Sequence, residues 1–163
     1  MFPGSIHEEI WGLLPVFVDQ SLRKAALLYL ESLRAYPIVL HAEERLQIDL
    51  YQTPPSLRDQ TVLENAFHQA FKAVEVLLGG PLPKANRKLQ RKLLKLELKP
   101  DTEVSRNKTL IEVIREVEAV RDRRAAHGKP YQEPFAFWEV AESQRLARFM
   151  VTEIGRHTRD REV

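Results

Sequence analysis

Residues 63–80 read LENAFHQAFKAVEVLLGG, and this stretch decides the fold class. Within it, apolar residues recur at steps of four and three, namely at Leu63, Phe67, Ala70, Val74 and Leu77. These steps place all five on one face of an α-helix, as in a helix buried in a bundle. Gly79 and Gly80 are expected to end this helix, because glycine adopts the left-handed conformation of a helix C-terminus at low cost.

Further helices are predicted on both sides of this stretch. Residues 19–34 and 84–97 show the same helical spacing, and a longer helix is expected from about 102 or 105 to 127. A last helix is expected to begin at Glu133-Pro134 and to fray from Thr158 onward. Trp138, within this last helix, is expected to be a core aromatic residue.

The predicted fold class is therefore all-α, a single-domain helical bundle of four to six helices. Two parts are expected: an unassigned N-terminal helical segment at 1–55 and the bundle core at 56–157. Residues 37–52 fit both a strand and a helix, and good helix formers favour the helix. The helix near 56–78 and the helix ending at His127 are expected to pack centrally, because their apolar stripes are unbroken.

Composition narrows the class of protein. A length of 163 residues predicts one domain. The sequence contains no run of 18 apolar residues, so no membrane span is predicted. The chain contains no cysteine, which excludes disulfides and Cys-ligated zinc and makes a cytoplasmic location the expectation. The start of the chain lacks the pattern of a signal peptide. His, Asp and Glu show no ligand spacing of a metal site, so neither a metal nor another cofactor is expected.

A basic segment spans residues 84–99, where seven lysines and arginines accompany Glu97 as the only acidic residue. Because the whole chain carries a net charge of only +2, the remainder is net acidic. Lys88, Arg91 and Lys95 recur at helical spacing and are predicted to bind the phosphates of RNA. The alternative is a solvated helix face that binds nothing.

Residues 121–128 read RDRRAAHG, at the end of the predicted long helix. An arginine and a histidine at this spacing occur by chance roughly once or twice in such a chain, and Arg34 with His41 is a second example. Six positions along a helix rotate a side chain by about 240°, so Arg121 and His127 do not share one helix face. A two-fold homodimer that joins the ends of two such helices is expected to bring them together.

The chemistry of these residues suits RNA cleavage without a metal ion. The imidazole of His127 can remove the proton of a 2′-hydroxyl near neutral pH. Arg121 can bind the phosphate oxygens as negative charge develops on them, and Asp122 can orient either group. Arg123 and Arg124 are predicted to bind phosphate, and they oppose the imidazolium form that a helix C-terminus favours.

Over roughly residues 56–155 the chain resembles the HEPN superfamily of all-α domains. Residues 63–79 look like the long core helix of that family, which often carries an acidic residue where Glu75 stands. Residues 121–127 match its motif of arginine, four to six residues, and histidine, with the polar Asp122 directly after the arginine. Glu75 is equally well explained as a structural ion-pair partner.

This resemblance implies a bundle, often dimeric, with a composite site at the dimer interface. It implies a metal-independent endoribonuclease, such as a toxin or antiviral effector, that acts on RNA and has a protein antitoxin or regulatory partner. The alternative is a catalytically inactive module of the same fold that binds RNA, a nucleotide or a partner protein. Lys129 stands where some members carry a tyrosine that is adenylylated, which argues against that form of control.

Overall fold

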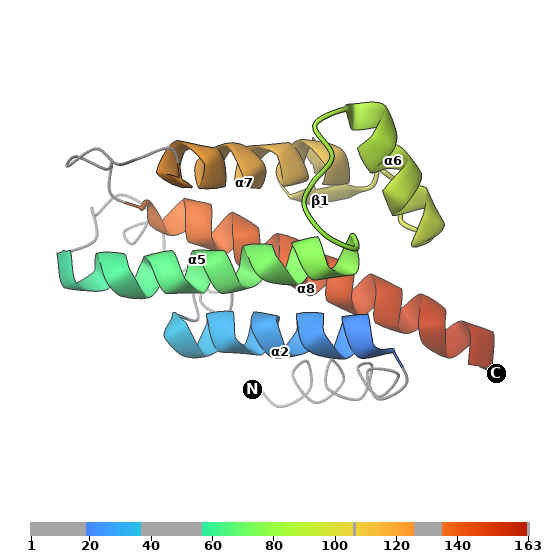
Figure 1. Ribbon diagram of the computed structural model, residues 1–163, viewed down its shortest axis with the longest axis horizontal. Coiled ribbons are helices and arrows are strands. Elements are labelled where there is room, and N and C mark those ends of the chain that lie inside the picture. Colours follow the sequence, from blue (N-terminus) through green and yellow to red (C-terminus); the bar gives the residue numbers. More distant parts are fainter. Residues whose placement is uncertain (1–18, 37–56, 106, 126–134, 163) are drawn as a thin grey trace.

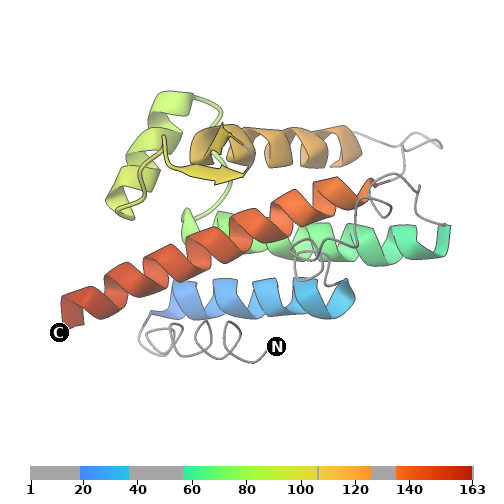
Figure 2. The same cartoon turned by 180° about the vertical axis from the view of Figure 1, so that it is seen from behind.

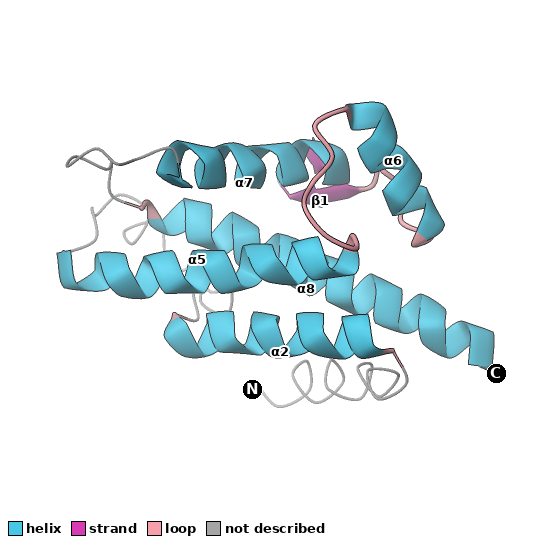
Figure 3. Ribbon diagram, in the orientation of Figure 1, coloured by secondary structure: helices cyan, strands magenta, loops and turns pink. Residues whose placement is uncertain are grey.

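The computed structural model describes residues 19–36, 57–105, 107–125 and 135–162, and these residues form an all-α bundle (Figure 1). The helices described are α2 (Gln20–Ala35), α5 (Leu57–Leu77), α6 (Asn86–Lys95), α7 (Leu110–Ala125) and α8 (Phe137–Glu162). A short antiparallel hairpin of β1 (Glu103–Ser105) and β2 (Lys108–Thr109) precedes α7 (Figure 3). The predicted all-α fold class is confirmed.

Helix α5 lies inside the bundle, as its apolar spacing predicts. All five residues of the stripe that begins at Leu63 are buried. Helix α5 packs against α2 and α8, and Figure 1 shows α2 and α7 on opposite sides of it. Helix α2 contributes Leu22, Ala25 and Tyr29 to the same hydrophobic core. The segment that the sequence left unassigned therefore supplies one of the core helices.

Helix α8 takes the central position that the sequence assigned to the helix ending at His127. It packs against α2, α5, α7 and β1, and Figure 2 shows it crossing the bundle between α7 and α2. Its residues Leu146, Ala147 and Met150 are fully buried. Helix α7 lies at one side of the bundle, although its predicted stripe of Leu110, Val113, Val117 and Val120 is buried.

The ends of α2 and α5 follow from their sequences. The carboxylate of Asp19 accepts hydrogen bonds from the backbone N–H groups of Ser21 and Leu22, at 2.8 and 3.0 Å, and so caps α2. Gly79 and Gly80 have φ angles of 72° and 123°, and the Gly80 N–H donates to the Glu75 carbonyl. The predicted glycine stop after α5 is thus confirmed.

The expected helix start at 102 or 105 is wrong, because the chain forms the hairpin there first. Asn107 at the hairpin turn has a φ of 64°, a conformation that asparagine tolerates and that an α-helix excludes. Helix α7 then begins next to a contact between Thr109 and Glu112, in which the glutamate reaches back as in one half of a capping box. The Glu112 carboxylate accepts hydrogen bonds from the Thr109 N–H and hydroxyl, both at 2.8 Å. These bonds lower the pKa of Glu112 below its usual value.

Two further expectations about α8 are wrong. The helix continues to Glu162 instead of fraying from Thr158, and Arg161 near its end forms an ion pair with Glu97 at 2.7 Å. Trp138 is 42% exposed and is not a core residue. The expectations for residues 37–52, for the boundary at 55–56 and for His127 lie outside the described residues.

A buried polar contact joins α2, α5 and α8. The Ser32 hydroxyl donates to the Ala66 carbonyl at 2.6 Å. The Gln144 amide donates to the Ser32 hydroxyl at 3.0 Å and to the Tyr36 carbonyl at 2.6 Å. Ser32 and Gln144 are completely buried, so these bonds fix how the three helices meet.

Replacing Gln144 with leucine is expected to lower the free energy of unfolding by about 1–3 kcal/mol, because buried acceptors lose their donor. Gln69→Leu is the control, since Gln69 contacts Asn65 at the surface and its loss is expected to cost less than about 0.5 kcal/mol. Urea denaturation measures both. Equal midpoints for the two variants would contradict the role of the Gln144 contact.

Candidate functional site

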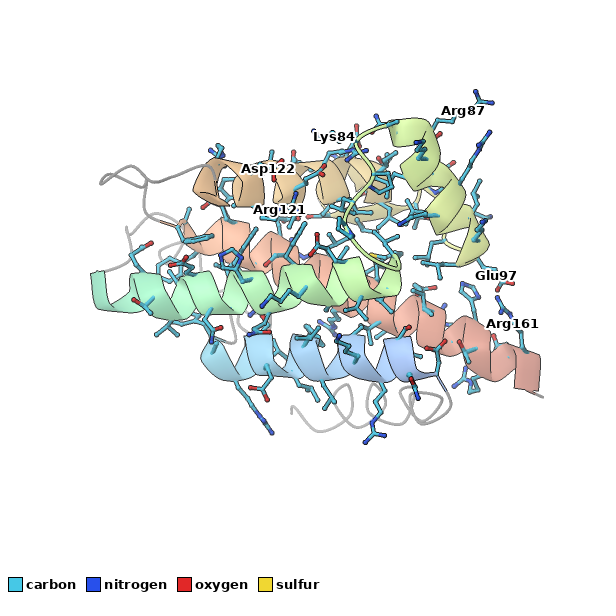
Figure 4. All side chains as sticks on the ribbon, viewed as in Figure 1. Lys84, Arg87, Glu97, Arg121, Asp122 and Arg161 are labelled. Carbon is cyan, nitrogen blue, oxygen red and sulfur yellow. The ribbon has the colours of Figure 1, made fainter. Side chains whose placement is uncertain are left out.

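The structure describes part of the candidate site. The side chains of Arg121, Asp122 and Arg123 are described, whereas for Arg124 only the helical backbone is. His127 lies outside the described residues. Arg121 stands about one helical turn before the last residue of α7, and Figure 4 shows it on the side of α7 that faces α5.

The guanidinium of Arg121 is held between two helices. Its Nη1 donates to the Glu75 carboxylate of α5 at 2.8 Å, and its Cζ lies 4.6 Å from the centre of the Phe71 ring. Its Nε and Nη2 donate to Asp122 Oδ1 at 2.9 and 2.8 Å. The ion pair with Glu75 accounts for the acidic residue that the sequence left open between a structural and a functional role.

Arg121 nevertheless remains accessible to an anion. Its side chain is 26% exposed, and only three of its five N–H donors form hydrogen bonds to described residues. Asp122 is 62% exposed, so its ion pair with Arg121 contributes little to stability. A phosphate that approaches from solvent can therefore replace Asp122 while Glu75 and Phe71 keep the guanidinium in place.

Two further residues, Glu118 and Arg115, extend this arrangement along α7, and the sequence motif does not include them. Glu118 lies 3.8 Å from Arg121 and forms a hydrogen bond with Arg115. Arg115 also donates to Asn86 Oδ1 at 2.8 Å and to the Pro83 carbonyl at 2.7 Å. The spacing of three residues between Arg115, Glu118 and Arg121 was the available signal, because such residues are neighbours on a helix. This series of contacts links Arg121 to the start of the basic helix α6.

Arg123 points to a different part of the bundle. Its Nη2 donates to Glu139 of α8 at 3.0 Å, and Glu139 is only 5% exposed. A second oxygen of Glu139 accepts from the Ala136 N–H at 2.9 Å, at the start of α8. Arg123 is therefore engaged in joining α7 to α8, and it does not gather with Arg121.

The basic segment forms an exposed surface on α6. Leu89 and Leu93 are buried and anchor the helix, while Lys88, Arg91 and Lys95 are exposed. These three side chains form no ion pair with another described residue. Lys84 and Arg87 are also exposed, and Figure 4 shows them at the start of α6. We call the exposed basic residues the α6 surface: Lys84, Arg87, Lys88, Arg91 and Lys95.

One lysine of this segment, Lys92, contacts the bundle instead of solvent. The Lys92 Nζ donates to the Leu78 carbonyl at 2.8 Å, near the end of α5. Lys92 is half-buried and so ties α6 to the bundle. The α6 surface is therefore a firmly placed basic face whose charges are directed to solvent.

The described residues include no group of three His, Cys, Asp or Glu side chains placed to hold a metal ion. In the same part of the chain, no helix is long and apolar enough to cross a membrane. The chain matches no protein-family model, no curated protein and no solved structure.

Proposed function

We propose that this protein is a metal-independent endoribonuclease in which Arg121 binds the scissile phosphate and His127 transfers the proton. The proposal joins the resemblance of residues 63–79 and 121–127 to the HEPN superfamily with the setting of Arg121. That setting is the observation that carries it. An ion pair with Glu75 and the Phe71 ring hold a partly exposed guanidinium in one orientation.

A fixed guanidinium assists phosphate chemistry in a defined way. Donors that are already oriented stabilise developing negative charge without the cost of reorganisation during the reaction. Glu75 and Phe71 supply this orientation for Arg121. The contact with exposed Asp122 is the one that a phosphate is expected to displace, since both compete for the same N–H groups.

In the proposed reaction, His127 removes the proton from the 2′-hydroxyl of the RNA. The freed 2′-oxygen attacks the adjacent phosphorus, and the bond from phosphorus to the 5′-oxygen of the next nucleotide breaks. The leaving 5′-oxygen takes up a proton, from an imidazolium or from water. The products are a 2′,3′-cyclic phosphate and a 5′-hydroxyl, and the step requires no metal ion.

A homodimer is part of this proposal. Six positions along a regular helix rotate a side chain by about 240°, so a helix that ran from Arg121 through His127 would separate these two side chains. In a two-fold dimer that joins the ends of the α7 helices, Arg121 of one protomer can meet the histidine of the other.

The second candidate function is RNA binding without cleavage, which the α6 surface favours. Its lysines and arginines suffice for binding to phosphates, since such contacts need no catalytic group. Incubating labelled RNA in EDTA with the wild type and with His127→Ala separates the two functions. Cleavage by the wild type but not by His127→Ala supports the endoribonuclease. RNA binding by both proteins, with cleavage by neither, supports the second candidate.

A further inference from the structure

A groove lies between the start of α2 and the second half of α5. It has a volume of about 770 Å³, within the range of sites that hold small organic ligands. Leu28 and Val76, both half-buried, form its apolar part. The polar side chains around it come from both helices: Gln20, Ser21, Lys24, Lys72 and Glu75.

The charge of the groove favours an anion. Lys24 and Lys72 are exposed and form no ion pair with any described residue. The one carboxylate of the groove, Glu75, is already paired with Arg121 at 2.8 Å. The start of α2 adds little to this charge, because Asp19 caps it. The two lysines therefore make the net charge of the groove positive.

The groove also adjoins the candidate site. Glu75 lines the groove and binds Arg121, so a single side chain separates the two. Lys72 precedes Glu75 by three residues and lies beside it on the same face of α5. A polymer bound at Arg121 can thus continue into the groove. A groove next to the candidate site therefore favours a ligand long enough to occupy both over a small free anion.

We infer that this groove is a subsite for the RNA strand on one side of the phosphate held by Arg121. Lys24 and Lys72 bind the phosphates of the strand, and Leu28 and Val76 contact a base or ribose. The side-chain amide of Gln20, which makes no hydrogen bond to another described residue, stands where it can meet the edge of a base. The inference rests on the proposed function for its choice of ligand.

The test measures binding of a fluorescein-labelled single-stranded RNA of 12 nucleotides, by anisotropy, in a His127→Ala background that prevents cleavage. Lys24→Glu/Lys72→Glu is expected to weaken binding about tenfold or more at low salt, because two contacts to charged groups are lost. The slope of log affinity against log salt is expected to flatten by about 1.4, at about 0.7 for each phosphate contact on a single strand.

Arg23→Glu/Arg34→Glu is the matched control. Both arginines are exposed on α2, neither lines the groove, and the change in net charge is the same. Equal affinities and salt slopes for the two double variants would overturn the groove as a subsite, and so would a failure of the background protein to bind this RNA. Cleavage by the protein with His127 intact is measured separately. RNA binding that depends on the groove, in a protein that never cleaves RNA, would overturn the proposed function and leave the groove in place.

Discussion

Replacing Arg121 with alanine is expected to lower the rate of RNA cleavage by about 10²–10³-fold, because a donor to the transition-state phosphate is lost. The same change breaks the ion pair with Glu75 and the contact with Phe71. We therefore expect the free energy of unfolding to fall by about 1 kcal/mol. Rates are measured well below the unfolding midpoint, by single-turnover cleavage of end-labelled RNA in EDTA.

Arg145→Ala is the matched control for this loss of stability. Arg145 is 29% exposed, against 26% for Arg121, and it binds Glu142 of α8 and Ser105 of β1, away from Glu75 and Phe71. It is expected to lose similar stability and to keep its cleavage rate. A similar drop in rate for both variants would assign the effect of Arg121→Ala to folding and would contradict its role at the phosphate.

Mixing two inactive variants extends this prediction to the dimer. In a composite site that takes Arg121 from one protomer and His127 from the other, a mixed dimer of Arg121→Ala and His127→Ala has one intact site. After subunit exchange at equal amounts, half of the dimers are mixed, so about a quarter of wild-type activity is expected to return. No recovery after verified exchange would contradict a site shared between protomers.

The second large effect is expected at the α6 surface. Lys88→Glu/Arg91→Glu/Lys95→Glu is expected to weaken RNA binding by about 10²-fold or more at low salt, for RNAs of every sequence. Contacts to phosphate carry no sequence information, which makes the loss uniform. The slope of log affinity against log salt is expected to flatten by about two, at about 0.7 for each contact to a single strand.

The control is the triple variant Arg23→Glu/Arg34→Glu/Arg159→Glu, which changes the net charge by the same amount at other positions. These three arginines are exposed and lie outside α6. Because Leu89 and Leu93 anchor α6 and are left in place, the reversed surface is expected to fold normally. Equal RNA affinity for the two triple variants at low and at high salt would show that the α6 surface is a solvated face.

Local patterns in the sequence predict most of the described bundle. The stripe of α5 and the stop at Gly79 and Gly80 both depend on residues within a few positions of one another. The hairpin before α7 was missed because its strands are very short. A local signal for the true start of α7 was nevertheless present, because Thr109 stands three residues before Glu112 and both of its donors bind that carboxylate.

The candidate site was predicted only in part, because its remaining contacts join distant parts of the chain. The motif indicated Arg121 and Asp122, whereas the orientation of Arg121 depends on Glu75, 46 positions away. The groove requires α2 and α5 to lie side by side, and no short pattern specifies that pairing. Arg123 shows the same limit, since its partner Glu139 belongs to another helix.

The most direct test of the central claim is the identity of the RNA ends produced in EDTA. We predict that the wild type releases fragments with a 2′,3′-cyclic phosphate and a 5′-hydroxyl, detected by mass spectrometry, and that His127→Ala releases none. The cyclic end follows from attack by the 2′-hydroxyl, and persistence in chelator follows from a reaction that uses Arg121 and His127 alone. Cleavage that requires Mg²⁺, or that survives His127→Ala, would contradict the proposed mechanism.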